Sequence, residues 1–173
     1  MTEKQEQILK TALRLFAEKG YDGTSTAKVA KAAGVSEGLI FRHFTNKEGL
    51  LKAVLEQGHE KVNQLYIQFS QEENPRKRLK NILDFVFTVP PEDYDFWRLI
   101  YALKWQTDAY DDSATAPLKE MLKGIFEEMH YQEPEAEAEL VMILLDGLVT
   151  AILLRKPKEL KQVQNLLHPR YML

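Results

Sequence analysis

The chain has 173 residues, of which 45% are hydrophobic and 28% are charged, and this balance excludes a chain that is disordered throughout. It contains no cysteine, which excludes disulfides, thiolate metal sites and thiol nucleophiles. The formal net charge is −3, but residues 1–50 carry +2 and the remainder carries −5, so DNA would be steered toward one end of the molecule. The first residues are polar and lack the apolar stretch of a secretory signal, so we expect a cytoplasmic protein.

Four helices are predicted in the first part of the chain. Apolar residues at helical spacing predict a helix over residues 3–19. Two short helices are expected over 26–33 and 36–43, with Gly34 between them. A long helix is expected to begin near residue 46 and to run to about residue 70.

The remaining helices are predicted from apolar spacing and from prolines at their boundaries, where proline starts or stops a helix. They are expected over residues 75–89, 93–106, 117–129, 134–155 and 158–167. The segment between residues 107 and 116 is polar and acidic and predicts a loop. No alternating strand pattern is present, so the sequence predicts an all-α fold of about nine helices.

Residues 24–44 carry a pattern that is typical of a helix-turn-helix. Two helices of about seven residues are not stable alone, so they must pack closely together. Ala30 and Ala33 are small at the expected contact, and Gly34 tolerates a positive φ in the turn. Three apolar side chains are expected to share a core: Val29, Val35 and Ile40. The alternative is an ordinary helical hairpin with a glycine turn.

Five segments carry a resemblance to one family: Leu15–Tyr21, Thr24–Thr26, Ala32–Ser36, Phe41–Phe44 and Asn46–Leu50. They resemble the tetracycline-repressor (TetR) family of transcriptional regulators. The resemblance is dense over the first third of the chain, whereas the rest is similar only in helix count, length and layout. It implies a helix-turn-helix DNA-binding domain over residues 1–47 and a helical effector-binding and dimerisation domain over residues 48–173. The implied partners are double-stranded operator DNA, a second copy of the chain and a small-molecule effector that releases the repressor.

The resemblance also implies that residues 36–43 form the recognition helix in the major groove of DNA. Nine residues are then candidates for DNA contacts: Ser25, Thr26, Ser36, Glu37, Gly38, Phe41, Arg42, His43 and Lys47. The Ser25 and Thr26 hydroxyls suit phosphate, and Arg42 suits guanine or phosphate. His43 and Lys47 are further candidates for phosphate contacts.

Two of these candidates, Phe41 and Glu37, have alternative interpretations. Phe41 suits contact with a thymine methyl group or a sugar, but it could instead belong to the core, as is expected for Phe44. Gly38 costs helix propensity and would let the backbone approach DNA closely. Glu37 is interpreted first as a favourable charge at a helix N-terminus and second as an acceptor from cytosine. The basic cluster at residues 76–78 is interpreted as ordinary surface.

Residues 140–154 are apolar apart from Asp146 and Thr150, and fifteen residues are too few for a membrane span, which needs about 20. A helix that is apolar all round is expected to be buried all round, which indicates a partner chain. The candidate dimer interface comprises Leu144, Gly147, Ala151 and Leu154, with Leu160, Val163 and Leu167 of the last helix. Asp146 and Thr150 lie one turn apart, and a structural hydrogen bond of Asp146 is preferred to a ligand contact.

A small apolar or aromatic effector is expected between the middle helices. Its candidate contacts are Phe85, Trp97, Tyr101, Trp105, Phe126 and Asp146, although such an aromatic stripe is also typical of a core. The four histidines lack metal-ligand spacing, and there is no glycine loop for phosphate. We therefore expect neither an enzyme nor a metal or other cofactor. The alternative to the DNA-binding repressor is a helical adaptor, or a regulator controlled by a protein partner.

Overall fold

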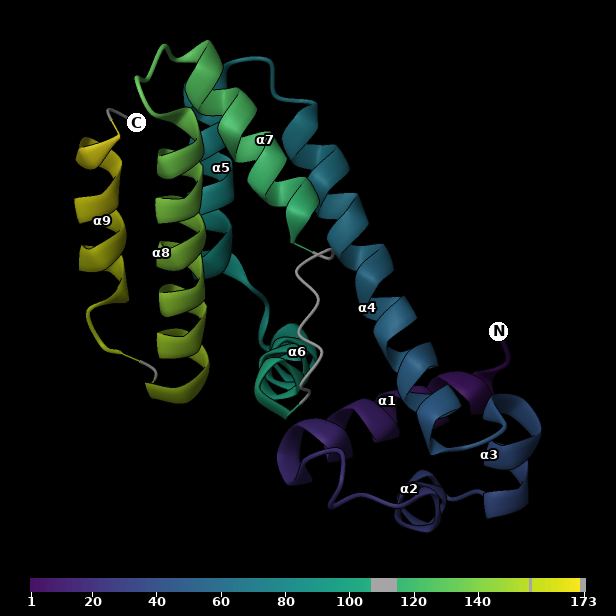
Figure 1. Cartoon of the computed structure of the whole chain (residues 1–173). Helices are drawn as coiled ribbons and strands as arrows, with labels where there is room; N and C mark the ends of the chain where they lie inside the picture. Colours follow the sequence, from purple (N-terminus) through teal and green to yellow (C-terminus); the bar gives the residue numbers. More distant parts are fainter. Residues whose placement is uncertain (107–114, 156, 172–173) are drawn as a thin grey trace. The chain divides into compact units, whose positions relative to one another are not determined.

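A computed structural model describes residues 1–106, 115–155 and 157–171 of the chain, without the side chains of residues 104–106 (Figure 1). These residues form nine α-helices and one short 3-10 helix, Pro91–Asp93, and contain no strand, so the all-α prediction is confirmed. The chain divides into two compact units. The first comprises Met1–Asn63 and Glu92–Asp108, and the second comprises Gln64–Pro91 and Ala109–Leu173.

The first unit contains the three N-terminal helices, most of the fourth, and the sixth. Their bounds are α1 Glu3–Lys19, α2 Thr26–Ala33, α3 Glu37–Phe44, α4 Lys47–Ser70 and α6 Tyr94–Gln106. Polar residues fix where several of them begin. The Thr2 side chain accepts from the backbone N–H of Gln5, and the Gln5 side chain accepts from the backbone N–H of Thr2, which is a capping box. The Ser25 hydroxyl accepts from the Lys28 N–H at the start of α2.

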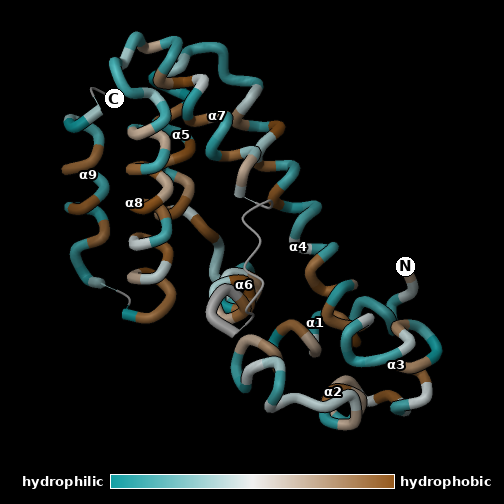
Figure 2. Tube along the Cα trace, viewed as in Figure 1, coloured by the Kyte–Doolittle hydropathy of each residue, from teal (hydrophilic) through white to brown (hydrophobic). Residues whose placement is uncertain are grey.

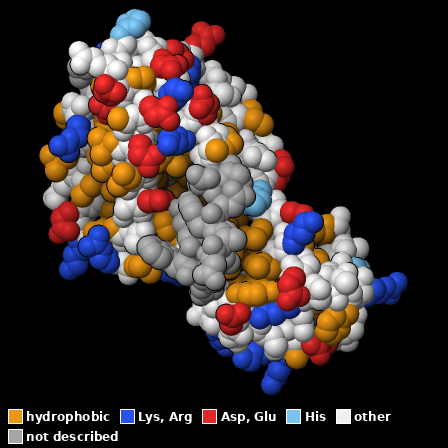
Figure 3. Space-filling view, viewed as in Figure 1, with side chains coloured by type: hydrophobic (Ala, Val, Ile, Leu, Met, Phe, Trp, Pro, Cys, Tyr) orange, Lys and Arg blue, Asp and Glu red, His pale blue; other side chains and the backbone are white. Residues whose placement is uncertain are grey.

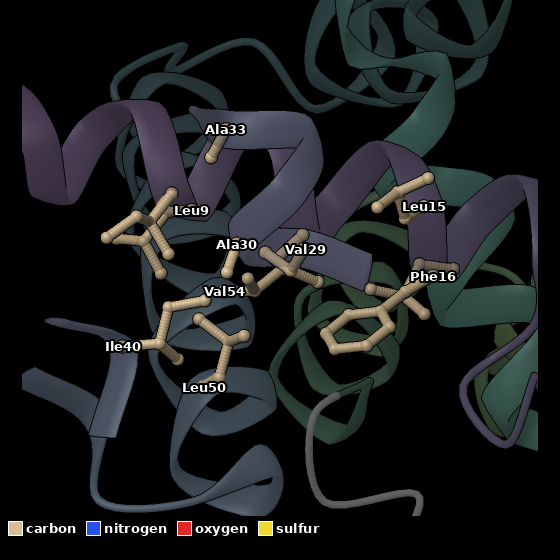
Figure 4. Packing of buried hydrophobic residues seen from close by; sticks show 12 residues of the cluster. Leu9, Leu15, Phe16, Val29, Ala30, Ala33, Ile40, Leu50 and Val54 are labelled. Atoms are coloured by element: carbon tan, nitrogen blue, oxygen red, sulfur yellow. The ribbon is translucent and has the colours of Figure 1, made fainter. Parts of the chain in front are cut away.

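One hydrophobic cluster holds this unit together, and Figure 4 shows the side chains of α1, α2, α3 and α4 pointing toward one another. Ile8, Phe16, Val29, Ile40 and Leu50 have no exposed surface. The cluster also includes one residue of α4 and one of α6 beyond these: Val54 and Leu99. The sequence-based division ends the first domain at residue 47, whereas this core continues into α4 and α6 because their apolar side chains complete it.

The second unit contains α5 Pro75–Thr88, α7 Ala116–Glu128, α8 Pro134–Arg155 and α9 Leu160–Arg170. Helix α7 packs on α8, and α5 packs on α7, α8 and α9. The core is formed by apolar side chains of all four helices, including Leu79, Leu83, Leu122, Ile125, Phe126, Val141 and Leu167. A polar cluster ties α9 to α5: Asp84 accepts hydrogen bonds from Gln164 and His168, each at 2.7 Å, and is paired with Lys80.

Helix α8 is apolar along much of its length, as Figure 2 shows, but its own unit buries only part of it. Ala138, Val141 and Leu145 are buried, whereas Leu140, Ile143 and Leu154 are exposed. The expectation of burial on every side is therefore not met within one chain, because α5 and α7 cover only part of the helix surface. No helix in the described ranges combines the length and hydropathy that a membrane span requires.

Candidate nucleic-acid interface

The turn between α2 and α3 is built on Gly34. Its φ of 68° and ψ of 31° are left-handed, a conformation that favours glycine. The Gly34 N–H points at the carbonyl oxygens of Ala30 and Lys31 in the last turn of α2. The Val35 N–H donates to the Ala30 carbonyl oxygen at 3.0 Å. Ala30 and Ala33 are buried at this end of α2. The turn therefore has the helix-turn-helix geometry that the small residues and the glycine predict.

A second close approach fixes the end of α3 against the start of α4. A Cβ atom on Gly49 would lie 2.0 Å from the Phe44 carbonyl oxygen, so any side chain at position 49 would force the two helices apart. The Asn46 side chain accepts from the Gly49 N–H at 2.7 Å and caps α4. The direction of α3 is therefore set at both of its ends.

Helix α3 buries one side and exposes the other. Ile40 is fully buried, whereas Gly38, Phe41 and Arg42 are exposed, and 47% of Phe41 is accessible. A Cβ atom on Gly38 would have no neighbour within 4 Å, so packing within the protein does not require glycine there. The exposed side of α3 thus combines a backbone without a side chain, an aromatic ring and a guanidinium group.

The hydroxyl groups of Ser25 and Thr26, at the start of α2, differ in whether their proton is already donated within the protein. Ser25 accepts from the Lys28 N–H at 3.2 Å and keeps its own proton for another acceptor. Thr26 donates its proton to Oε1 of Glu37, the first residue of α3, at 2.6 Å. Ser36, the residue before α3, makes no capping hydrogen bond with its side chain and is exposed.

His43 and Lys47 are each held by a residue from outside the helix-turn-helix. Nε2 of Gln5 lies 3.2 Å from Nδ1 of His43. The Lys47 ammonium lies 4.0 Å from the centre of the Tyr21 ring, which is a cation–π contact. Burial, followed by the negative charges of Glu48 and Asp22, raises the pKa of Tyr21, so the ring keeps its phenolic proton.

The structure brings the nine sequence-predicted DNA residues together in one segment of the first unit, from the start of α2 to the start of α4. Sequence reasoning missed the residues that position them, Gln5 and Tyr21. The Thr2–Gln5 capping-box pattern marks Gln5 as a helix-start residue, but nothing in the sequence pairs it with His43. Tyr21 lies in a turn after α1 and carries no periodic signal.

The residues predicted for effector binding are divided between the units. Trp97 and Tyr101 lie on α6 of the first unit and are half-buried. Phe85, Phe126 and Asp146 belong to the second unit, where Phe126 is fully buried and Asp146 is exposed. The side chain of Trp105 lies outside the described residues. Phe126 packs edge-on against Tyr131, with 5.0 Å between ring centres, so its surroundings are those of a core residue.

The predicted interface residues also differ in exposure within one chain. Gly147 and Leu154 are exposed, Ala151 and Leu167 are buried, and the others are half-buried: Leu144, Leu160 and Val163. Three further apolar side chains of α8 and α9 are exposed: Leu140, Ile143 and Leu166. Hydrophobic side chains gather over α8 and α9 on the face that Figure 3 shows.

One residue of the basic cluster at residues 76–78 has a structural role in the second unit. Arg78, from the basic cluster at residues 76–78, donates to Glu128 at 3.1 Å and to the backbone oxygen of Glu72 at 2.8 Å. It therefore ties α5 to α7 and to the turn before α5. Across the described ranges, no group of three or more histidine, aspartate and glutamate residues is arranged to hold a metal ion.

Comparisons with known proteins agree with this geometry. Residues 8–54 match the family of bacterial regulatory proteins described as the tetR family. Over 93 residues the chain is 36% identical to the HTH-type transcriptional regulator YerO of Bacillus subtilis, a match that covers 54% of this chain and 28% of YerO. Matches to three curated regulators of that organism span only 28% to 33% of their lengths.

Two solved structures share the fold over most of the chain. A transcriptional regulator from Saccharomonospora viridis, in complex with choline, superposes with a TM-score of 0.81 at 19% identity and covers 98% of this chain and 97% of its own. AibR, in complex with isovaleryl coenzyme A and operator DNA, has a TM-score of 0.70 at 22% identity and covers 87% of this chain and 86% of its own. The N-terminal segment of the chain, with its helix-turn-helix, therefore matches the tetR family of bacterial regulatory proteins, and the chain as a whole shares the fold of these two solved structures.

Proposed function

We propose that the protein is a transcriptional regulator that binds operator DNA with α3 in the major groove. The observation that carries the proposal is the two-sided character of α3, which packs through Ile40 and exposes Gly38, Phe41 and Arg42. An eight-residue helix is about 12 Å long and fits the major groove, where Arg42 can donate twice to guanine. Phe41 supplies apolar contact with a thymine methyl group.

Phosphate contacts would come from the flanks of α3. Ser25 and Ser36 have hydroxyl protons to donate, and Lys47 lies at the start of α4 with its charge held over Tyr21. His43 would add a ring N–H. AibR, which shares the fold, was crystallised with operator DNA. A regulator of bacterial genes works where the chromosome is, so we place this protein in the cytoplasm.

The exposed apolar side of α8 and α9 is proposed as the contact with a second copy of the chain. Leu140, Ile143 and Leu154 recur on α8 at spacings that return to the same side, with Gly147 between them. A Cβ atom on Gly147 would meet nothing within 4 Å, so this position leaves room for an approaching helix. Identical copies around a two-fold axis would require an operator with inverted half-sites.

A small-molecule effector that weakens operator binding completes the proposal. AibR and the Saccharomonospora regulator were crystallised with small molecules, isovaleryl coenzyme A and choline. Trp97 and Tyr101 are the candidate contacts in the first unit, where α6 packs on α1 and Leu99 lies in the core of the DNA-binding helices. Phe85 and Asp146 are the candidates in the second unit, whereas the buried Phe126 belongs to its core. An effector can act only if it binds the DNA-free state more tightly than the DNA-bound state.

Selection of purified protein on random duplex DNA tests the proposal. We expect one enriched palindromic sequence and an affinity that falls steeply with salt, because phosphate contacts release counterions. Enrichment of no sequence would contradict it and would favour the alternative, a helical adaptor that binds only proteins. A compound screen by tryptophan fluorescence, followed by DNA titration with each ligand found, tests the effector. Ligands that bind without changing DNA affinity would favour control by a protein partner.

A further inference from the structure

We propose that Glu37 recognises cytosine in each operator half-site and that Thr26 positions its carboxylate for this contact. The inference rests on the proposed DNA-binding function and deepens it by assigning a base to one residue. Glu37 is the first residue of α3, and the N-terminal residues of a recognition helix are those that contact base edges.

The carboxylate of Glu37 is held at one oxygen and open at the other. Oε1 accepts the Thr26 hydroxyl proton at 2.6 Å, a short charge-assisted hydrogen bond that fixes the side chain. In the described part of the chain, Glu37 has no cation within ion-pair distance. Oε2 therefore keeps its capacity to accept, and the side chain is only half-buried, so this oxygen can reach a ligand outside the protein.

Oε2 of Glu37 can only accept a hydrogen bond, so the base that it contacts must present a hydrogen-bond donor in the major groove. Phosphate oxygens are negatively charged acceptors, so they repel a carboxylate. The major groove offers two donors, the N4 amino group of cytosine and the N6 amino group of adenine. The adenine amino group lies beside the acceptor N7, which would face carboxylate oxygen, whereas cytosine presents no acceptor of its own in the groove. Cytosine is therefore the base that Glu37 fits best.

The single hydroxyl proton of Thr26 supports this assignment. While this proton is donated to Glu37, it cannot also be donated to phosphate. Ser25 differs, because its hydroxyl only accepts from the Lys28 N–H and its proton remains available. Thr26 is therefore a positioning residue, and Ser25 is the hydroxyl with a proton left for the DNA backbone. A charge placed only to favour the α3 dipole would stabilise the helix but would give no base preference.

Selection on random duplex DNA with matched variants tests the inference. The wild type is expected to enrich cytosine at one position of each half-site. Glu37→Gln is expected to lose that preference and to favour adenine, because a side-chain amide pairs with N6 and N7 of adenine. Thr26→Val keeps the shape of the side chain and removes the donor, so cytosine should remain preferred with weaker discrimination. Glu56→Gln is the matched control, because it removes an exposed carboxylate on α4 outside the candidate DNA-contact residues, and it should leave the selected sequence unchanged.

Titration of the selected operator and of its single-base variants gives the size of the effect. Replacement of the selected cytosine by another base should reduce the operator affinity of the wild type on the order of 10-fold to 100-fold. The same replacement should have little effect on the operator affinity of Glu37→Gln. Glu37→Gln should also bind unrelated duplex DNA more tightly than the wild type does, since a negative charge has left the DNA-binding face. Circular dichroism establishes that each variant is folded.

The outcomes separate the inference from the function on which it rests. If the wild type enriches no sequence, the proposed function fails and the inference fails with it. If the wild type enriches an operator and Glu37→Gln enriches the same bases with the same discrimination, the function stands and the cytosine assignment is overturned. Undiminished discrimination in Thr26→Val would overturn the positioning role of Thr26.

Discussion

Gln5, in the first turn of α1, donates a hydrogen bond to Nδ1 of His43, in the last turn of α3, with 3.2 Å between the two nitrogens. The orientation of the Gln5 amide is fixed because its oxygen accepts from the Thr2 N–H at 2.7 Å. An amide nitrogen only donates, so Nδ1 acts as the acceptor and the proton of the neutral ring is on Nε2. A residue of α1 thus determines which histidine nitrogen keeps a proton to donate.

Replacement of Gln5 by alanine should therefore weaken operator binding. We expect a loss of about 1 kcal/mol, the usual size of one hydrogen bond, measured by fluorescence anisotropy with labelled operator. Thr2→Ala is the matched control, because it removes the Thr2 side chain from the same cap and leaves the Gln5 amide beside His43. It should lower the free energy of unfolding by about 1 kcal/mol without changing operator affinity. Equal affinity losses in both variants would contradict the proposed role of Gln5.

Gly38→Ala should make the protein more stable and a weaker DNA binder. A Cβ atom meets nothing within 4 Å at this helical position, so alanine should raise the free energy of unfolding by up to about 1 kcal/mol. The added methyl group would obstruct close approach to DNA. Gly124→Ala in α7 is also unobstructed and should bring similar stability with unchanged operator affinity. Thermal denaturation and DNA titration check both variants, and full affinity in Gly38→Ala would show that DNA does not approach this backbone.

Arg42→Ala should weaken operator binding by about 1–3 kcal/mol and relax the base preference at one position of each half-site. Because Arg42 is exposed, the unfolding temperature should be unchanged. Arg14→Ala removes the same charge from α1, where the arginine is paired with Glu18, and should have a much smaller effect. An Arg42→Ala protein with wild-type affinity would remove this residue from the interface.

If α8 forms the proposed dimer contact, Ile143→Glu should yield a folded monomer. Ile143 is 61% exposed in the single chain, so glutamate is tolerated there unless a second chain covers it. Ile67→Glu on α4 is the control, since that isoleucine is 51% exposed and lies outside the proposed contact. Sedimentation at micromolar concentration should show a monomer for the first variant and a dimer for the second. A dimer in both cases would place the contact elsewhere.

Asp84 should make stability depend on pH at the acidic end of the range. Burial raises its pKa, but hydrogen bonds from Lys80, Gln164 and His168 lower the pKa to about 2, from 3.8. The carboxylate therefore stabilises the fold above pH 3.8, and this stability is lost as the pH falls toward 2. Asp84→Asn should cost about 2 kcal/mol at pH 6 by chemical denaturation.

The difference in stability between wild type and Asp84→Asn should shrink as the pH approaches 2. Glu73→Gln, at an exposed carboxylate of the same unit, should show no such difference at any pH. A difference for Asp84→Asn that stays constant with pH would mean that packing, and not charge, links α5 to α9.

The helices could be predicted from the sequence because their starts and stops depend on local residues such as Ser25, Gly34 and Pro134. The nine candidate DNA-contact residues could be placed in one segment, because the same local signals define the helices that carry them. Contacts between distant residues could not be predicted: Leu99 joins the core of α1, and Gln5 meets His43, only after the helices have packed. In α8 the apolar residues have no preferred side, so helical periodicity could not separate the exposed Ile143 from the buried Val141.

The burial of α3 through Ile40, with its exposed residues on the opposite side, has an evolutionary consequence. Substitutions at Gly38, Phe41 and Arg42 would change the surface offered to DNA without removing a buried side chain from the core. A gene duplicate could therefore acquire a new target sequence in single steps, with little loss of stability at any of them. Gly49, where even a methyl group would meet the Phe44 carbonyl oxygen, should be the position in this region that tolerates least variation among descendants.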